Sequence, residues 1–279
     1  MRYSRLIFSR GLMLTSLRSF NLCLVKAFSL CLCTLLSMSC VKENREVCPC
    51  RLIVDLSEVN PLRIGSVDIR LSSSQGFSYE TSRGAESYEN DDVILVPRDN
   101  VFLNVCYADR GMMTDEGLSI PEGDDCPPIY MYSSLVSTKG QEYVRKPVRM
   151  IKNHCVMTIY LEGEPPQSPY SIFIKGNVCG YDSLGSPKEG VFLCSPRAVS
   201  DSVFDVVLPR QSDASLVLEI NDGGEVFKTF ALGEYVKACG YSWSEDDLKD
   251  ITVRIDYAIS QVVIAVKGWD EVYEFDIVI

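Results

Sequence analysis

The feature that most restricts the fold of this chain is an alternation of apolar and polar residues, which recurs from residue 51 to the C-terminal end. In residues 250–259, Ile251, Val253 and Ile255 share one side of a two-residue repeat, and Thr252 and Arg254 share the other. Successive side chains of a β-strand point to opposite faces, so this pattern predicts strands with one buried face. Comparable runs, rich in β-branched residues, occupy residues 51–56, 65–71, 93–97, 100–109, 154–163, 170–176, 202–209, 214–220, 225–232, 261–268 and 271–279. The sequence therefore predicts an all-β protein.

Local signals between the late strands predict one hairpin and two short helices. The turn sequence NDGG at residues 221–224 separates two strand-like runs, which is typical of a β-hairpin. Residues 232–240 end on a glycine suited to a helix C-terminus. Residues 244–250 begin with Ser244, which suits the N-cap position, and Asp247 follows three residues later as in a capping box. Both helices are too short to form a helical domain.

The chain is long enough for two domains. An acidic, proline-rich loop occupies residues 122–130, another proline-rich loop occupies residues 163–169, and strand signals resume at His154 and continue to the end. We therefore expect two tandem β domains, each a sandwich or a barrel, at residues 51–151 and 152–279, with the short helices in the second.

The N-terminal segment has the composition of a secretory signal. Residues 1–39 contain five basic and no acidic residues, and the apolar run AFSLCLCTLL at residues 27–36 follows the last positive charge. A membrane-spanning helix needs about 20 apolar residues, roughly twice the length of this run. We predict a cleaved signal over residues 1–39. A retained anchor helix is the alternative, and translation could also start at Met13.

Cys40 is the predicted first residue of the mature protein. The small residue Ser39 precedes it directly, as lipoprotein signal peptidase requires, although Ser37 stands where the usual pattern has leucine. Two or three acyl chains on Cys40 would hold the protein durably on a membrane, where one chain would not. Residues 40–50 would then form a lipid-tethered linker. The alternative is a plain signal peptide that is cut nearby.

The charge of the mature chain excludes some partners. Without residues 1–39, 22 of the 27 basic residues remain against 38 acidic ones, which gives a net charge of −16. Nucleic-acid binding relies on neutralisation of phosphates by Lys and Arg, so nucleic acid is not expected as a partner. Docking on an anionic lipid surface by charge is not expected either.

Neither a catalytic motif nor a cofactor motif is present, so we predict that the protein is not an enzyme. The only histidine, His154, lies in a predicted strand with Cys155 pointing to the opposite face. Eight cysteines other than Cys40 remain in the mature chain; their even number permits disulfides, but they lack paired zinc spacings. Glu122, Asp124 and Asp125 could bind calcium, although adjacent carboxylates in a loop are more often solvated charge. No metal or cofactor is therefore predicted.

The order of these features resembles the FimB/Mfa-type fimbrial anchor subunits of Gram-negative gut and oral anaerobes. The resemblance covers residues 40–279 and rests on a lipoprotein cysteine, CPCRLIVDL soon after it, and the strand pattern that closes on VVIAVKGWDEVYEFDI. The segment GYDSLG at residues 180–185 and the pair Gly268 and Trp269 carry it most clearly.

The resemblance implies two transthyretin-like β-sandwich domains. It also implies an outer-membrane lipoprotein, attached through acyl chains such as palmitate on Cys40, at the base of a fimbrium that it anchors and whose growth it ends or regulates. Cell adhesion would be a property of the assembled fibre. Its partners would be pilin subunits that join by strand complementation, in which main-chain hydrogen bonds supply affinity.

Several alternatives stay open from the sequence. The C-terminal strand, residues 271–279, is a candidate for strand exchange, although it is more often a closing core strand. A surface glycan-binding lipoprotein would have the same tether and fold, and exposed platforms at Trp243 and Trp269 would favour it. Buried tryptophans beside an open strand edge would favour the anchor. A fimbrial tip or accessory adhesin is a further alternative.

Overall fold

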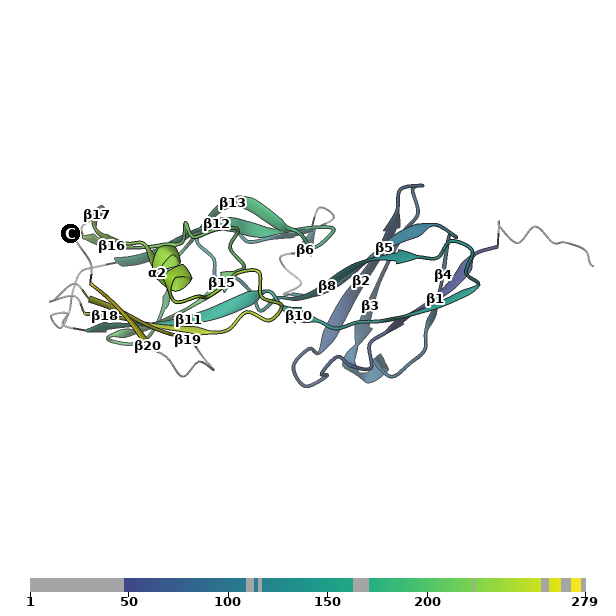
Figure 1. Cartoon of the computed structure of the whole chain (residues 1–279), viewed down its shortest axis with the longest axis horizontal. Helices are drawn as coiled ribbons and strands as arrows, with labels where there is room; N and C mark the ends of the chain where they lie inside the picture. The colour runs from purple at the N-terminus through teal and green to yellow at the C-terminus, as the bar shows by residue number, and fades with distance from the viewer. Residues whose placement is uncertain are drawn as a thin grey trace, which may run out of the picture. The chain divides into compact units, whose positions relative to one another are not determined.

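The computed structural model describes residues 48–108, 113–114, 117–162, 171–222, 224–256, 261–266 and 272–276 (Figure 1). Within these residues nearly every element is a strand, and the predicted all-β fold class is confirmed. The strands are β1 (Cys50–Asp55), β2 (Ser66–Ser73), β3 (Ser78–Gly84), β4 (Val93–Val96), β5 (Asn100–Tyr107), β6 (Met113–Thr114), β7 (Gly117–Ser119), β8 (Tyr130–Ser137), β9 (Tyr143–Pro147), β10 (Ile151–Lys152), β11 (His154–Glu162), β12 (Ser171–Asp182), β13 (Pro187–Cys194), β14 (Arg197–Ser200), β15 (Val203–Pro209), β16 (Val217–Asp222), β17 (Glu225–Phe230), β18 (Ile251–Asp256), β19 (Gln261–Val266) and β20 (Val272–Asp276).

The first core lies between a three-stranded sheet, in the order β4-β1-β9, and a five-stranded sheet, in the order β10-β8-β5-β2-β3. Strands β1 and β9 run parallel, and the other pairs of these two sheets run antiparallel. Val101, Leu103 and Val105 occupy every second position of β5 and are fully buried in this core, as the two-residue repeat of a strand predicts.

The second core lies between two six-stranded arrangements. One sheet has the order β14-β15-β11-β18-β19-β20, and the other has the order β17-β16-β12-β7-β6, with β13 paired to β12 beside that path. Met157 and Ile159 of β11 and Ile174 of β12 are fully buried between them. The predicted hairpin at residues 221–224 joins β16 and β17, which pair antiparallel.

The two cores are not separated at a single point of the sequence. Strand β7, which precedes β8 in the chain, pairs with β12 of the second sandwich. The following backbone continues along the second sandwich: Ile120 N–H donates to Cys179 O at 2.8 Å, Gly123 N–H to Leu193 O at 2.7 Å, and Cys126 N–H to Val207 O at 3.2 Å. The chain then returns to the first sandwich in β8. The division into folding domains at residues 151 and 152 stays a prediction.

One predicted helix is present and the other is not. Helix α2 (Leu232–Ala238) matches the first prediction, and Gly240 follows it with φ of +82°. The prediction of a helix over residues 244–250 is wrong, because these residues form turns and bends. The guanidinium of Arg210 donates to the carbonyl oxygens of Trp243, Glu245 and Asp246, so these acceptors are not available to helical N–H groups.

Among the described residues, α2 is the only α-helix, and no helix there has the length and apolar character needed to span a membrane.

Candidate functional site: sheet edges and a polar pocket

The predicted lipidation site, Cys40, lies outside the described residues, as do Gly268 and Trp269. The described chain begins at Cys48, which is exposed, and Cys50 is buried as the first residue of β1. The first described strand therefore begins ten positions after the predicted acylated cysteine. The eight described cysteines form no disulfide with one another.

Two strands lie at the edges of the first six-stranded sheet of the second sandwich. Strand β14 pairs with β15 through a bulged register, and all four of its residues are exposed, Val199 among them. At the other edge β20 pairs with β19, with Tyr273 packed against the core and Val272 exposed. In the described part of this sheet each of the two strands has one paired neighbour. An edge of this kind presents backbone groups to which another strand can pair.

Trp243 does not form an exposed platform for sugar stacking. Its ring packs in part against the second core and meets the ring of Tyr241 edge-on, with 5.1 Å between the ring centroids. Its carbonyl oxygen accepts from Arg210, which fixes the loop around it. Of the two tryptophans, the one that the structure describes is therefore a packing residue.

His154 also has a structural environment. Its ring is buried, lies edge-on to Tyr130 and places Nδ1 at 3.0 Å from the backbone nitrogen of Ile129. The same Nδ1 lies 3.0 Å from the carbonyl oxygen of Ile129, so the tautomer decides whether it donates or accepts. Burial lowers the pKa of His154, which favours the neutral ring. The ring connects the loop before β8 to the start of β11.

The acidic loop that contains Glu122, Asp124 and Asp125 packs along the second sandwich through the backbone bonds of Gly123 and Cys126. Among the described residues, no group of three or more His, Cys, Asp or Glu side chains is arranged to hold a metal ion.

The segment GYDSLG forms the end of β12 and the turn into β13. Tyr181 is buried, and its hydroxyl donates to the carbonyl oxygen of Asn153 at 2.8 Å. Oδ1 of Asp182 accepts the N–H groups of Leu184 at 2.9 Å and of Ser186 at 2.8 Å, which closes the turn. Gly185 has φ of +84°, a conformation that L side chains rarely adopt. These contacts explain the local residue choice in this segment.

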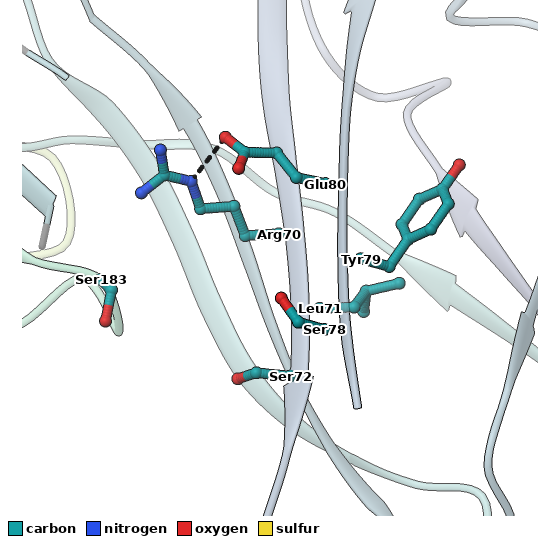
Figure 2. A pocket seen from close by; sticks show the side chains of 7 residues that line it. All are labelled: Arg70, Leu71, Ser72, Ser78, Tyr79, Glu80 and Ser183. Atoms are coloured by element: carbon teal, nitrogen blue, oxygen red, sulfur yellow. Dashed lines mark hydrogen bonds and ion pairs between the residues drawn. The ribbon is translucent and has the colours of Figure 1, made fainter. Parts of the chain in front are cut away.

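A polar pocket of about 300 Å³ lies where this turn approaches the five-stranded sheet. Figure 2 shows Arg70 and Glu80 on one side of β2 and β3, joined by an ion pair with 2.9 Å between Arg70 Nε and Glu80 Oε1. Ser72 and Ser78 form the next pair on the same side of the two strands, and Ser183 comes from the turn. The pocket thus offers hydroxyls and a charged pair.

The pocket has no aromatic stacking surface, even though Tyr79 contributes to its lining. Tyr79 pairs with Leu71 and shares its side of the sheet, which faces the first core, and Figure 2 shows both side chains directed away from the Arg70–Glu80 pair. Sequence reasoning did not find this pocket, because β3 was not predicted. The alternation of Tyr79 and Thr81 with polar residues in SYETSRG was the available signal.

The structure was compared with solved structures of other proteins. It aligns with a candidate polysaccharide-binding protein of Bacteroides thetaiotaomicron at a TM-score of 0.60 and 13% identity, covering 81% of this chain and 98% of that one. It aligns with a candidate adhesin of Bacteroides ovatus at 0.56 and 12%, covering 82% and 96%. It aligns with the fimbrial anchor protein Mfa2 of Porphyromonas gingivalis at 0.55 and 13%, covering 80% and 98%.

The chain shares the fold of these three proteins. Each alignment spans nearly the whole of the other chain, so the likeness includes both sandwiches rather than one. No protein-family model matches the sequence, and no curated protein matches it.

Proposed function

We propose that this chain is an outer-membrane lipoprotein that holds a fimbrium at its base, takes part in setting its length, and so contributes to cell adhesion. The observation that carries the proposal is the fold shared with the fimbrial anchor protein Mfa2, in a chain whose first described strand begins ten positions after a lipoprotein-type cysteine. The adhesin with the same fold supports a role at the cell surface. The comparison proteins are binding and fimbrial proteins rather than enzymes.

Attachment to the fibre would use an open sheet edge. Strands β14 and β20 lie at opposite edges of one sheet, and Val199 and Val272 are exposed on them. A strand of a pilin subunit can extend such a sheet through main-chain hydrogen bonds, with side-chain pockets supplying the specificity. A subunit that uses one edge and is held to the membrane at the other end of the chain would cap a filament without propagating it.

A crosslinking experiment in cells tests the anchor. After mild crosslinking, the envelope is extracted with detergent and the proteins joined to this chain are identified by mass spectrometry. We expect a ladder that contains a repeating β-sandwich pilin. Recovery of a glycan transporter alone would contradict the proposal.

The role of the lipid is tested by Cys40→Ala, which we expect to release the chain from the envelope and weaken the attachment of fimbriae to cells. Cys48→Ala is the matched control, because Cys48 is exposed in the same N-terminal region but does not follow a signal. Equal retention of the two variants would contradict acylation of Cys40.

The contribution of the edges is tested by placing a lysine on them, since a charge at an exposed edge position opposes strand pairing. We expect Val199→Lys or Val272→Lys to reduce the pilin ladder, whereas Leu62→Lys, at an exposed position between β1 and β2, should leave it intact. An undiminished ladder in both edge variants would exclude these strands.

A second candidate function is glycan binding, which the polar pocket and the shared fold of the polysaccharide-binding protein favour. Glu80→Gln would weaken retention on immobilised polysaccharide if the Arg70–Glu80 pair binds sugar hydroxyls. A tip or accessory adhesin would instead be found by immunogold labelling at the distal end of fimbriae.

A further inference from the structure

The outer face of the β4-β1-β9 sheet carries three apolar side chains that are about half exposed, beside Ile53, which is only 5% exposed. The pairing register aligns Leu95, Arg51 and Tyr143 in one row across the three strands, and Val93, Ile53 and Arg145 in the next row. Val93 is 50% exposed, Leu95 58% and Tyr143 49%. Residues on the other side of these strands, such as Leu52 and Ile94, fill the first core. One face of the sheet is therefore buried in the first core, and the outer face has exposed apolar surface at Val93, Leu95 and Tyr143.

The charges on this face are locally balanced. Nη1 of Arg145 lies 2.9 Å from Oδ2 of Asp55, and its other terminal nitrogen pairs with Asp91. Arg51 is exposed between Leu95 and Tyr143. Aliphatic side chains, a tyrosine and an arginine form the combination that suits the boundary between water and lipid, where a polar tip stays hydrated above an apolar body.

The face is also the part of the fold nearest in sequence to the predicted acyl group. Its first row contains Arg51, which follows Cys50, the first residue of β1. Cys50 lies ten positions after Cys40, and ten steps along a chain span at most about 36 Å, whatever its conformation. Acylation at Cys40 would therefore keep this row within a few tens of ångströms of the bilayer.

From this we infer that the outer face of β4-β1-β9 rests on the surface of the lipid bilayer and sets how the tethered protein lies on it. The inference rests on the proposed attachment at Cys40. Net charge does not drive the contact, because the mature chain is strongly acidic and anionic lipid would repel it. Burial of Val93, Leu95 and Tyr143 drives it, and Arg51 meets the phosphate of a zwitterionic headgroup.

Fluorescence quenching in vesicles tests this contact. The acylated full chain is reconstituted in phosphatidylcholine vesicles whose acyl chains carry bromine, which quenches nearby tryptophan. A tryptophan is introduced by Tyr143→Trp, and the control is Val191→Trp, at an exposed position of β13 in the second sandwich. The signal of the unsubstituted chain is subtracted, because it already contains two tryptophans.

Because an interfacial apolar face sinks about 5–10 Å into the headgroup and acyl boundary, we expect the Tyr143→Trp signal to fall by about half and the control signal to stay unchanged. Adding Leu95→Asp to Tyr143→Trp should remove the quenching while the chain still floats with the vesicles. Equal quenching at the two positions would overturn the inference.

Other results would show that a pilin or a second copy of the chain covers this face instead of lipid, or that the attachment at Cys40 is absent. An unquenched Tyr143→Trp signal, together with loss of the pilin ladder in Leu95→Asp, would assign the face to a pilin and overturn the lipid contact. A sedimentation shift to a dimer that Leu95→Asp abolishes would assign it to a second copy, with the same consequence. A chain that does not float contradicts the attachment at Cys40, whereas a floating chain without quenching contradicts only the face contact.

Discussion

Gly185, in the turn between β12 and β13, lies so close to Asn104 of β5 that a β-carbon added to the glycine would be 2.7 Å from Nδ2 of Asn104. The side chains of Ser133 and Met131 on β8 also border this point. The turn of the second sandwich therefore contacts the polar side of the five-stranded sheet of the first. Nδ2 of Asn104 in turn donates to Oγ of Ser133 at 2.9 Å, which orders the surface that receives the turn.

This contact predicts the effect of Gly185→Ala. The substitution places a methyl group against Asn104, Ser133 and Met131, and we expect a loss of about 2–4 kcal/mol in the free energy of unfolding from backbone strain and overpacking. Gly76→Ala is the matched control, because Gly76 has nearly the same φ, +85° against +84°, but an added β-carbon there meets nothing within 4 Å. Urea unfolding of the two variants measures the difference. Equal losses would show that the turn has room to move away.

Arg210 is predicted to hold the loop after α2. Its guanidinium bonds to Oδ1 of Asn153 at 2.9 Å and to carbonyl oxygens of residues 243–246. Lysine cannot reproduce this planar set of donors, so Arg210→Lys should cost about 2–4 kcal/mol and speed hydrogen exchange over residues 241–250. Arg254→Lys, in an exposed pair with Glu162, should change stability by about 0.5 kcal/mol or less. Unchanged exchange in the loop of Arg210→Lys would refute this role.

His154 predicts a pH dependence of stability. Burial lowers the pKa of the folded-state ring, so the unfolded chain binds a proton first as the pH falls below about 6.5, and folding stability decreases there. The chain has no other histidine, and histidine is the side chain that ordinarily titrates between about pH 5 and 8. Thermal unfolding across this range should show a fall toward acid in the wild type and a flatter profile in His154→Gln. Parallel profiles would contradict the assignment.

The cysteines predict a pattern of thiol reactivity. Burial raises the pKa of Cys106, Cys155 and Cys194 to about 12 and of Cys239 to about 11, so little thiolate forms at about pH 8. In a chain of residues 41–279, which lacks Cys40 and the three cysteines before it, we expect Cys48 and Cys179 to react with a chromogenic disulfide reagent before unfolding, and all eight thiols after it. Recovery of fewer thiols in denaturant under non-reducing conditions would reveal a disulfide.

The sequence predicted many of the strands that bury one regular face, although β8, whose middle is Ser133 and Ser134, was not predicted. Strands β5 and β18 follow their apolar alternation closely, because burial of Val101, Leu103 and Val253 depends only on the side to which each residue points. Strand β3 was missed because Tyr79 is the one large apolar side chain in SYETSRG, which is too weak an alternation to indicate a strand. Its place in the sheet comes from pairing with β2. Strand β9 was missed for a related reason: it is a short edge strand with exposed residues that ends on Pro147.

The candidate sites were harder to predict than the strands. The pocket brings Ser183 to Arg70 and Glu80, which are more than one hundred residues away in the chain, and no local pattern encodes that distance. The outer face of β4-β1-β9 depends on the parallel pairing of β1 with β9, which joins residues far apart in the sequence. The loop at residues 244–250 has the residues of a helix start, but its carbonyl groups bond to Arg210, which lies outside any local window.

If the protein holds a fibre under tension, as proposed, the path of the chain between the two cores has a mechanical consequence. The backbone leaves the first core after β5, pairs with β12 through β7, returns at Tyr130 and crosses again between Val148 and Cys155. A force applied between Cys50 and β20 cannot extend the last crossing alone. The earlier segment, residues 117–126, is already hydrogen-bonded to the second sandwich and connects the two sandwiches a second time. The hydrogen bonds of Ile120, Gly123 and Cys126 must break first, so the connection should resist load as a sheared set of strands rather than as a single flexible hinge.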